Sequence, residues 1–192
     1  RTHDVLMGGA DYEIYSEDNQ KSLVLYTAGQ FTKRKHYTGI IPDTPAELQE
    51  FNNNPPYGNS KNHTIQLGAQ FNLSLPDFLN GNNTLTFGTE YVVDDVFDEI
   101  GAYNYLIDQN SKNMGAFAQS DWVLPRWDFY VAASVSQTTF WRTGHMQNGR
   151  FPENSYGDGE KHNFTNFGLK GGTTYKITGR HYVTANGMIF TR

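Results

Sequence analysis

The feature that most constrains this chain is a long segment in which apolar and polar residues alternate one by one. Between Thr64 and Leu75 every odd-numbered position is apolar, and every even-numbered position is polar or glycine. Successive side chains of a β-strand point to opposite faces, so the segment predicts a strand with one apolar and one polar face. It is about twice as long as the usual soluble strand.

Less regular versions of the same alternation recur along the chain, and they predict an all-β, antiparallel fold. We expect about eight strands, near residues 5–15, 22–37, 63–75, 84–97, 113–124, 127–142, 163–177 and 181–191. The predicted connections are short and long in turn, at residues 16–21, 38–62, 76–83, 98–112, 125–126, 143–162 and 178–180. Transmembrane β-barrels have this asymmetry, because tight turns lie at one end and long outer loops at the other.

The order of the connections also orients the chain. If the short turns are periplasmic, the first strand runs downward from the outer surface and the last runs back up to it. A complete bacterial barrel is expected to begin and end in the periplasm. We therefore expect residues 1–192 to be part of a single β-barrel domain whose remaining strands lie elsewhere.

Composition excludes several other classes of protein. The chain has no cysteine, its net charge is −5, and its basic residues are scattered, so neither a disulfide framework nor a nucleic-acid partner is expected. The longest apolar run, Phe129 to Ala133, is far too short for a membrane-spanning helix. A mean hydropathy of −0.63 still suits a barrel wall, because half of each strand faces water.

Aromatic residues gather near the short-turn ends of the predicted strands, where an interfacial girdle would lie. The alternative is that they form ordinary cross-strand aromatic pairs. The residues are Trp122, Trp127, Phe129, Tyr175 and Tyr182.

Two passages resemble TonB-dependent outer-membrane receptors of the Bacteroidetes type. They are residues 87–122, FGTEYVVDDVFDEIGAYNYLIDQNSKNMGAFAQSDW, and residues 140–192, which include FWRTG, GRFPENSYGDGEKHNF and FGLKGGTTYKITGRHYVTANGMIFTR. The resemblance covers roughly the second half of the chain. Residues 1–83 share only the rhythm of strands and loops.

This resemblance implies a location in the bacterial outer membrane and a barrel of about twenty-two strands that imports a scarce nutrient, such as a siderophore, cobalamin or a glycan. It implies contact with outer-membrane lipid, with the TonB complex through a plug domain absent from these residues, and with a small-molecule or oligomeric nutrient. A surface lipoprotein is a further partner to consider. The alternatives are a complete eight-stranded structural or adhesive barrel, and a secreted β-sandwich that binds carbohydrate.

Candidate ligand contacts lie in or beside the three long predicted loops. In the first, the prolines of residues 38–62 stiffen a loop without regular structure, so that Tyr37 and Tyr57 either grip a ligand or pack on the loop. In the second, Tyr103 and Tyr105 either stack on a ligand ring or pack on the loop's base. The third offers bidentate arginines for an anionic ligand, with the candidates Trp141, Arg142, Arg150 and Tyr156.

Catalytic and metal-binding motifs are missing from the sequence. No H-x-x-x-H pair, G-x-S-x-G elbow or P-loop occurs, so we expect neither enzyme activity nor a cofactor. Four carboxylates of the second loop could suit calcium, but their spacing matches no EF-hand. We interpret them as a solvated acidic loop and expect no metal; they are Asp94, Asp95, Asp98 and Glu99.

Overall fold

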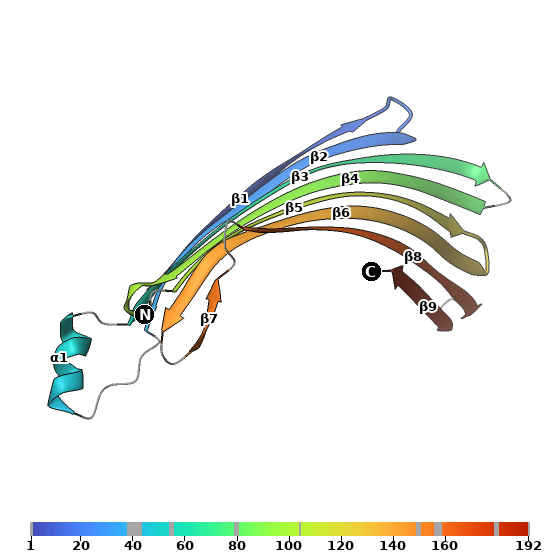
Figure 1. Cartoon of the computed structure of the whole chain (residues 1–192). Helices are drawn as coiled ribbons and strands as arrows, with labels where there is room; N and C mark the ends of the chain where they lie inside the picture. Colours follow the sequence, from blue (N-terminus) through green and yellow to red (C-terminus); the bar gives the residue numbers. More distant parts are fainter. Residues whose placement is uncertain are drawn as a thin grey trace.

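The computed structural model contains one curved antiparallel sheet in which every long strand pairs with the next along the chain (Figure 1). The strand order is β1-β2-β3-β4-β5-β6-β8-β9, and the short β7 pairs with β6. The described residues are 2–37, 44–53, 56–78, 81–103, 105–148, 151–155, 159–178 and 181–191, without the side chains of 50, 78, 103, 145–148 and 151–155. The prediction of an all-β antiparallel fold is confirmed.

The strands are longer than the sequence pattern indicated. They are β1 (Thr2–Tyr15), β2 (Lys21–Tyr37), β3 (Tyr57–Phe78), β4 (Gly81–Ile100), β5 (Tyr105–Val123), β6 (Trp127–Asn148), β7 (Phe151–Ser155), β8 (Glu160–Thr178) and β9 (His181–Thr191). A helix, α1 (Pro45–Asn53), follows β2, and a 3-10 turn, η1 (Gly101–Tyr103), follows β4. Most of the extra length lies at the ends near the predicted long loops, where alternation fades because both faces are polar.

Expectations about all three long loops were wrong. Residues 38–62 do contain regular structure, because α1 forms there and β3 already begins at Tyr57. The second loop, expected at residues 98–112, is wrong in its bounds, because β4 and β5 continue to pair up to Ile100 and Tyr105 and the 3-10 turn η1 follows β4 directly. Its polar sequence belongs to strands rather than to a loop. The third, expected at residues 143–162, includes the end of β6, all of β7 and the start of β8, because strand pairing continues there.

The start of α1 is defined by local chemistry. Pro45 occupies the first helical position, where its missing N–H costs nothing. The hydroxyl of Thr44 accepts the backbone N–H of Glu47 at 3.4 Å and donates to the Glu47 carboxylate at 2.8 Å. Thr44 is therefore the N-cap of α1, because its hydroxyl satisfies a backbone donor that the first turn leaves unbonded.

Strand register divides the sheet into two chemically different faces. On β2, the register partners of odd-numbered β3 residues include Leu23, Leu25 and Phe31. On β4 they include Phe87 and Tyr91. We call this the apolar face. The opposite surface, the polar face, carries residues such as Gln66, Glu90 and Asp94.

The apolar side chains form a continuous band that crosses the strands obliquely. Register partners can be followed from Leu6 on β1, strand by strand, to Lys161 on β8. The apolar run of β8, however, begins at Phe167, six residues further along (167 − 161). Over the six steps from strand to strand, the start of the apolar run therefore shifts by one residue per step on average. With about 3.3 Å per residue and about 4.8 Å between strands, the strands tilt by roughly 35° from the band's normal.

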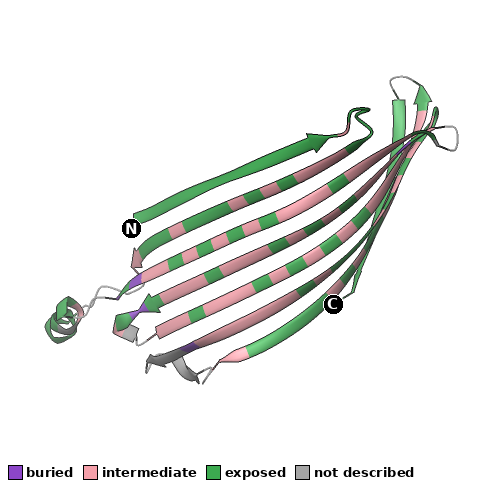
Figure 2. Cartoon of the chain, turned by 90° about the horizontal axis from the view of Figure 1, so that it is seen from above, coloured by how far each residue is buried: buried purple, intermediate pink, exposed green. Residues whose placement is uncertain are grey.

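No second layer covers either face in the part of the chain that the structure describes. Among the described hydrophobic residues only Ile100 is buried, and Ile65, Phe71, Phe87 and Val131 are 55%, 38%, 47% and 45% exposed. In Figure 2 exposed and half-buried residues alternate along β4 and β5, and the more exposed ones lie on the apolar face. Side chains diverge on the convex side of a curved sheet, so we assign the apolar face to that side.

The β1–β2 turn is closed by one carboxylate. Asp18 accepts the hydroxyl of Ser16 at 2.5 Å and the backbone N–H of Gln20 at 3.0 Å, while Asn19 adopts the left-handed conformation with φ 55°. The Ser16 bond, followed by the backbone bond, lowers the pKa of Asp18 below its ordinary value. The turn thus favours the ionised carboxylate.

We predict that Ser16→Ala raises the pKa of Asp18 toward the usual aspartate value, as measured by NMR titration of its carboxyl carbon. Because the folded-state pKa is lowered, the carboxylate helps to hold the turn above about pH 4 and stops doing so as pH falls through the lowered pKa. Ser22→Ala, one residue beyond the turn, is the control and should leave Asp18 unchanged. An unaltered Asp18 titration in Ser16→Ala would contradict the assignment.

Candidate binding surfaces of the sheet

The candidate residues of the first loop meet in one aromatic cluster. Tyr37 and Tyr57 are directly paired at the ends of β2 and β3, with ring centroids 5.6 Å apart in an edge-to-face arrangement. Phe51 of α1 packs on Tyr37 at 5.9 Å. The cluster packs the helix against the ends of β2 and β3, as in the alternative that these tyrosines pack on the loop. Tyr57 remains 57% exposed, so its ring is also accessible to a ligand.

The two third-loop candidates that the structure describes, Trp141 and Arg142, lie on different surfaces. Trp141 and Arg142 are neighbours on β6, so they lie on opposite faces of the sheet. Trp141 packs where a Cβ of Gly159 would lie, and Arg142 forms an ion pair of 3.0 Å with Glu160 on β8. Arg150 and Tyr156 lie outside the described residues.

The second-loop tyrosines are at the strand ends. Tyr105 begins β5 and is half-buried on the polar face, where it pairs with Ile100. Tyr103 belongs to η1, and its side chain lies outside the described part. Among the candidates whose side chains the structure describes, Tyr37 and Tyr57 are the pair in ring contact.

The four carboxylates of the expected acidic loop belong to β4 and are divided between its faces. Asp94 and Asp98 lie on the polar face, where they accept the hydroxyls of Thr64 at 2.6 Å and Ser60 at 2.7 Å. Asp95 lies on the other face and accepts the side-chain amide of Asn110. Among the described residues, no three histidine or acidic side chains are grouped to hold a metal ion.

Cross-strand hydrogen bonds connect side chains along the polar face. At its centre the carboxylate of Glu90 accepts the side-chain amide of Gln66 at 2.6 Å and the hydroxyl of Tyr26 at 3.1 Å, so that β2, β3 and β4 are joined. Further along, Asn113 donates to Thr138 at 2.7 Å. These bonds fix polar groups on a surface suited to water and polar solutes.

Aromatic rings on this face lie over glycines of the neighbouring strand. Tyr26 is directly opposite Gly68, and a Cβ on that glycine would overlap the ring. The same direct pairing occurs once more between β2 and β3 and once in each of three other strand pairs. The further pairs are His36 with Gly58, Phe117 with Gly88, Tyr130 with Gly172 and Phe190 with Gly168. Rings placed this way shield the backbone that glycine exposes, and they lie flat on the polar face instead of projecting from it.

The aromatic residues of the short-turn end lie mostly on the apolar face, in direct cross-strand pairs. Trp122 stacks on Phe129 with centroids 4.7 Å apart, and Trp127 contacts Tyr175 at 4.6 Å. Tyr182, by contrast, pairs with Lys176 and lies on the polar face. Four of the five expected girdle residues therefore share the apolar face.

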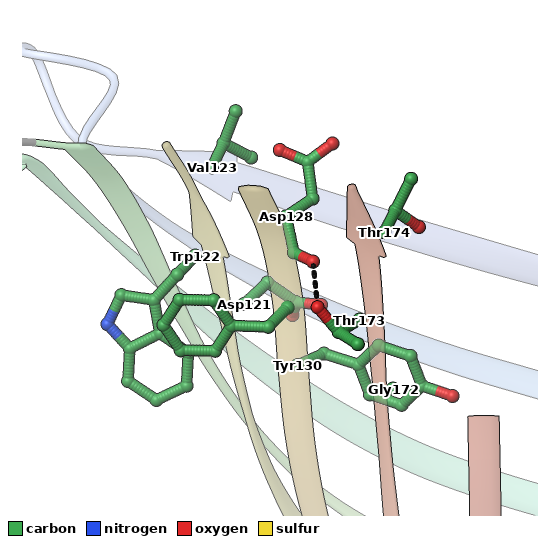
Figure 3. Close-up of a pocket in the computed structure, with 9 residues that line it drawn as sticks. Asp121, Trp122, Val123, Asp128, Tyr130, Gly172, Thr173 and Thr174 are labelled. Carbon is green, nitrogen blue, oxygen red and sulfur yellow. Dashed lines mark hydrogen bonds between the residues drawn. The ribbon is translucent and has the colours of Figure 1, made fainter. Parts of the chain in front are cut away.

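A shallow hollow lies beside the Trp122–Phe129 stack, where Gly172 and Thr173 are small (Figure 3). The hydroxyl of Thr173 donates to the backbone carbonyl of Asp128 at 3.3 Å. The carboxylate of Asp128 lies on the other side of the strands from the Trp122 ring, and it is paired with Lys176 at 2.6 Å.

Comparison with known proteins adds no identity. No protein-family model matches the chain, and no curated protein matches it significantly. In the described part of the chain, none of the helical segments has the length and apolar character needed to cross a membrane.

Sequence analysis missed the Tyr26–Gln66–Glu90 group and the five ring–glycine pairs. Each residue was visible in the sequence, but its partner is set by strand register. The glycines within alternating segments were the one available signal, because glycine inside a strand often marks a close approach by another group.

We predict that Gly68→Ala destabilises the folded protein by about 1–3 kcal/mol, because its methyl group must displace the Tyr26 ring from Glu90. Gly115→Ala is the matched control on the same face, since its nearest neighbour would be at 3.5 Å. The free energy of unfolding in lipid or detergent is the measurement. In a double-mutant cycle with Tyr26→Ala the two effects should not add; strict additivity would refute the contact.

Proposed function

We propose that this chain forms part of the wall of an outer-membrane β-barrel that belongs to a TonB-dependent receptor and imports a scarce nutrient. The observation that supports it best is the oblique apolar band on one face, opposite a hydrogen-bonded polar face. Such a wall has hydrocarbon on one side and an aqueous lumen on the other.

The dimensions of the band agree with a membrane. On β3 the apolar run from Ile65 to Leu75 rises by about 33 Å along the strand. At the roughly 35–45° tilt of outer-membrane strands this corresponds to a height of about 23–27 Å, close to the apolar thickness of about 25 Å. Both faces become polar beyond the band, as expected where strands project into water.

Neither alternative agrees as well with the geometry. A sandwich would bury the apolar side chains under a second sheet, whereas they lie on an uncovered face of the described structure. A small eight-stranded barrel would pair its first and last strands, but β1 and β9 pair only with β2 and β8 in the described sheet. An open edge must be paired before it can enter lipid, so further strands are required.

The wall can be tested by spin labels placed one at a time along β3 of the full-length polypeptide that contains this chain. Labels at Ile65, Leu67 and Phe71 should be accessible to oxygen dissolved in the bilayer, and labels at the matched positions Gln66 and Gln70 to a water-soluble relaxation agent. The expected result is an accessibility that alternates with a period of two residues. Equal accessibility to the water-soluble agent at all five sites would exclude a lipid-facing wall.

The import function requires a separate test. Uptake of candidate siderophores, cobalamin and glycans is measured in cells that produce the full-length polypeptide, with and without a functional TonB complex. Uptake of one class should need both the polypeptide and TonB, and removal of residues 38–56 should weaken its binding without removing the barrel from the membrane. Insertion of the barrel with TonB-independent uptake would leave the wall but refute the receptor.

A further inference from the structure

Two of the ring–glycine pairs on the polar face are neighbours in the sheet. Gly68 on β3 and Gly88 on β4 are offset by two residues in register, so they are diagonal neighbours about 7–8 Å apart. Tyr26 reaches over Gly68 from β2, and Phe117 reaches over Gly88 from β5. The two rings therefore approach one patch of the sheet from opposite sides, and we call them the ring platform.

The ring faces that point away from the sheet are open. Each ring has the backbone of a glycine beneath it, and in the described structure no second sheet covers the polar face. Tyr26 and Phe117 are accordingly half-buried. Tyr130 lies over Gly172 in the same way, but the ammonium group of Lys170 is placed over its ring, 5.4 Å from the centre. The ring platform has no such cation among the described contacts, so it offers a free stacking surface.

Hydrogen-bonding groups of several kinds border the two rings. Oε2 of Glu90 accepts the hydroxyl of Tyr26 at 3.1 Å and the side-chain amide of Gln66 at 2.6 Å. Gln70, further along β3 on the same face, donates to Asn72 at 2.9 Å. A carboxamide has two N–H donors and a carbonyl oxygen with two lone pairs, so both glutamines keep bonding capacity. Donors beside acceptors suit hydroxyl groups, which can act as either.

The charge around the ring platform is negative. Asp11 on β1 is the register partner of Tyr26, and Glu13 is the next residue of β1 on the polar face. Glu90 on β4 is the third carboxylate. Within four residues of these register positions, no lysine or arginine lies on the polar face of the described strands β1–β6. An anionic solute would therefore be repelled, whereas a neutral one would not.

We infer that the ring platform binds sugar rings of a neutral oligosaccharide on the lumen side of the wall. The inference rests on the proposed function, because it requires the polar face to line an aqueous lumen, and it names the class of nutrient. The apolar C–H faces of pyranose rings would stack on Tyr26 and Phe117. Their hydroxyl groups would bond with Gln66, Gln70 and Oε1 of Glu90. A cation could use the rings and the carboxylates but not the amide donors, so the mixture of groups favours a sugar.

The test uses the full-length polypeptide that contains this chain, in a detergent without a sugar headgroup. Maltohexaose, cellohexaose and xylohexaose are the probes, and binding is measured by isothermal titration calorimetry. At least one should bind, and Phe117→Leu should weaken that binding about five- to tenfold, because one stacking ring is lost. Gln70→Ala, which leaves both rings in place, should weaken it about threefold.

Tyr130→Leu is the matched control. It also removes a ring from over a glycine of the polar face, but Lys170 already covers that ring. Any general damage from an uncovered glycine would appear in both leucine variants, whereas the control should bind the oligosaccharide as the parent does. Equal loss in the two leucine variants overturns the inference.

Other outcomes also decide against a sugar site. Failure of all three probes to bind the parent, or binding that neither Phe117→Leu nor Gln70→Ala changes, overturns it. Choline binding that exceeds oligosaccharide binding and is lost in Glu90→Gln would assign the ring platform to cations instead. TonB-dependent uptake of a siderophore or cobalamin without oligosaccharide binding would leave the proposed receptor standing and refute only the sugar site.

Discussion

The structure depends on backbone pairing between neighbouring strands, because little else holds it together. A single sheet has no interior, and hydrophobic burial cannot supply the main stabilisation when almost every described apolar residue is at least partly exposed. The antiparallel ladders are continuous over nearly the full strand lengths, so backbone donors and acceptors between strands are satisfied. In lipid, where water cannot replace a missing hydrogen bond, that is the condition for crossing a membrane.

The two faces perform different tasks on the same ladder. The apolar face carries few charges within the band, and lysines lie at both of its edges: Lys33 and Lys61 at the end that carries α1, and Lys21, opposite Leu73, at the other end. On the polar face, hydrogen bonds around Glu90 and rings that lie over glycines, such as Tyr26 over Gly68, hold the polar side chains in place.

Strand tilt links register to the position of the band. If the strands stood upright, the row through Leu6 would remain apolar across the sheet; instead it passes through His63 and Asp95 to Lys161. The sequence compensates by starting each apolar run about one residue lower on successive strands. A level band on a tilted sheet is the arrangement that a flat bilayer would require of the proposed barrel wall.

The sequence by itself determined the all-β class, the approximate places of eight strands and the division of each into two faces, because side-chain alternation is a local property of a strand. It could not set the register. Tertiary structure alone decided that Tyr26 covers Gly68, that Arg142 pairs with Glu160, and that β4 and β5 remain paired up to Ile100 and Tyr105. Such pairings join residues far apart in the chain, and local patterns carry no information about which strand lies beside which.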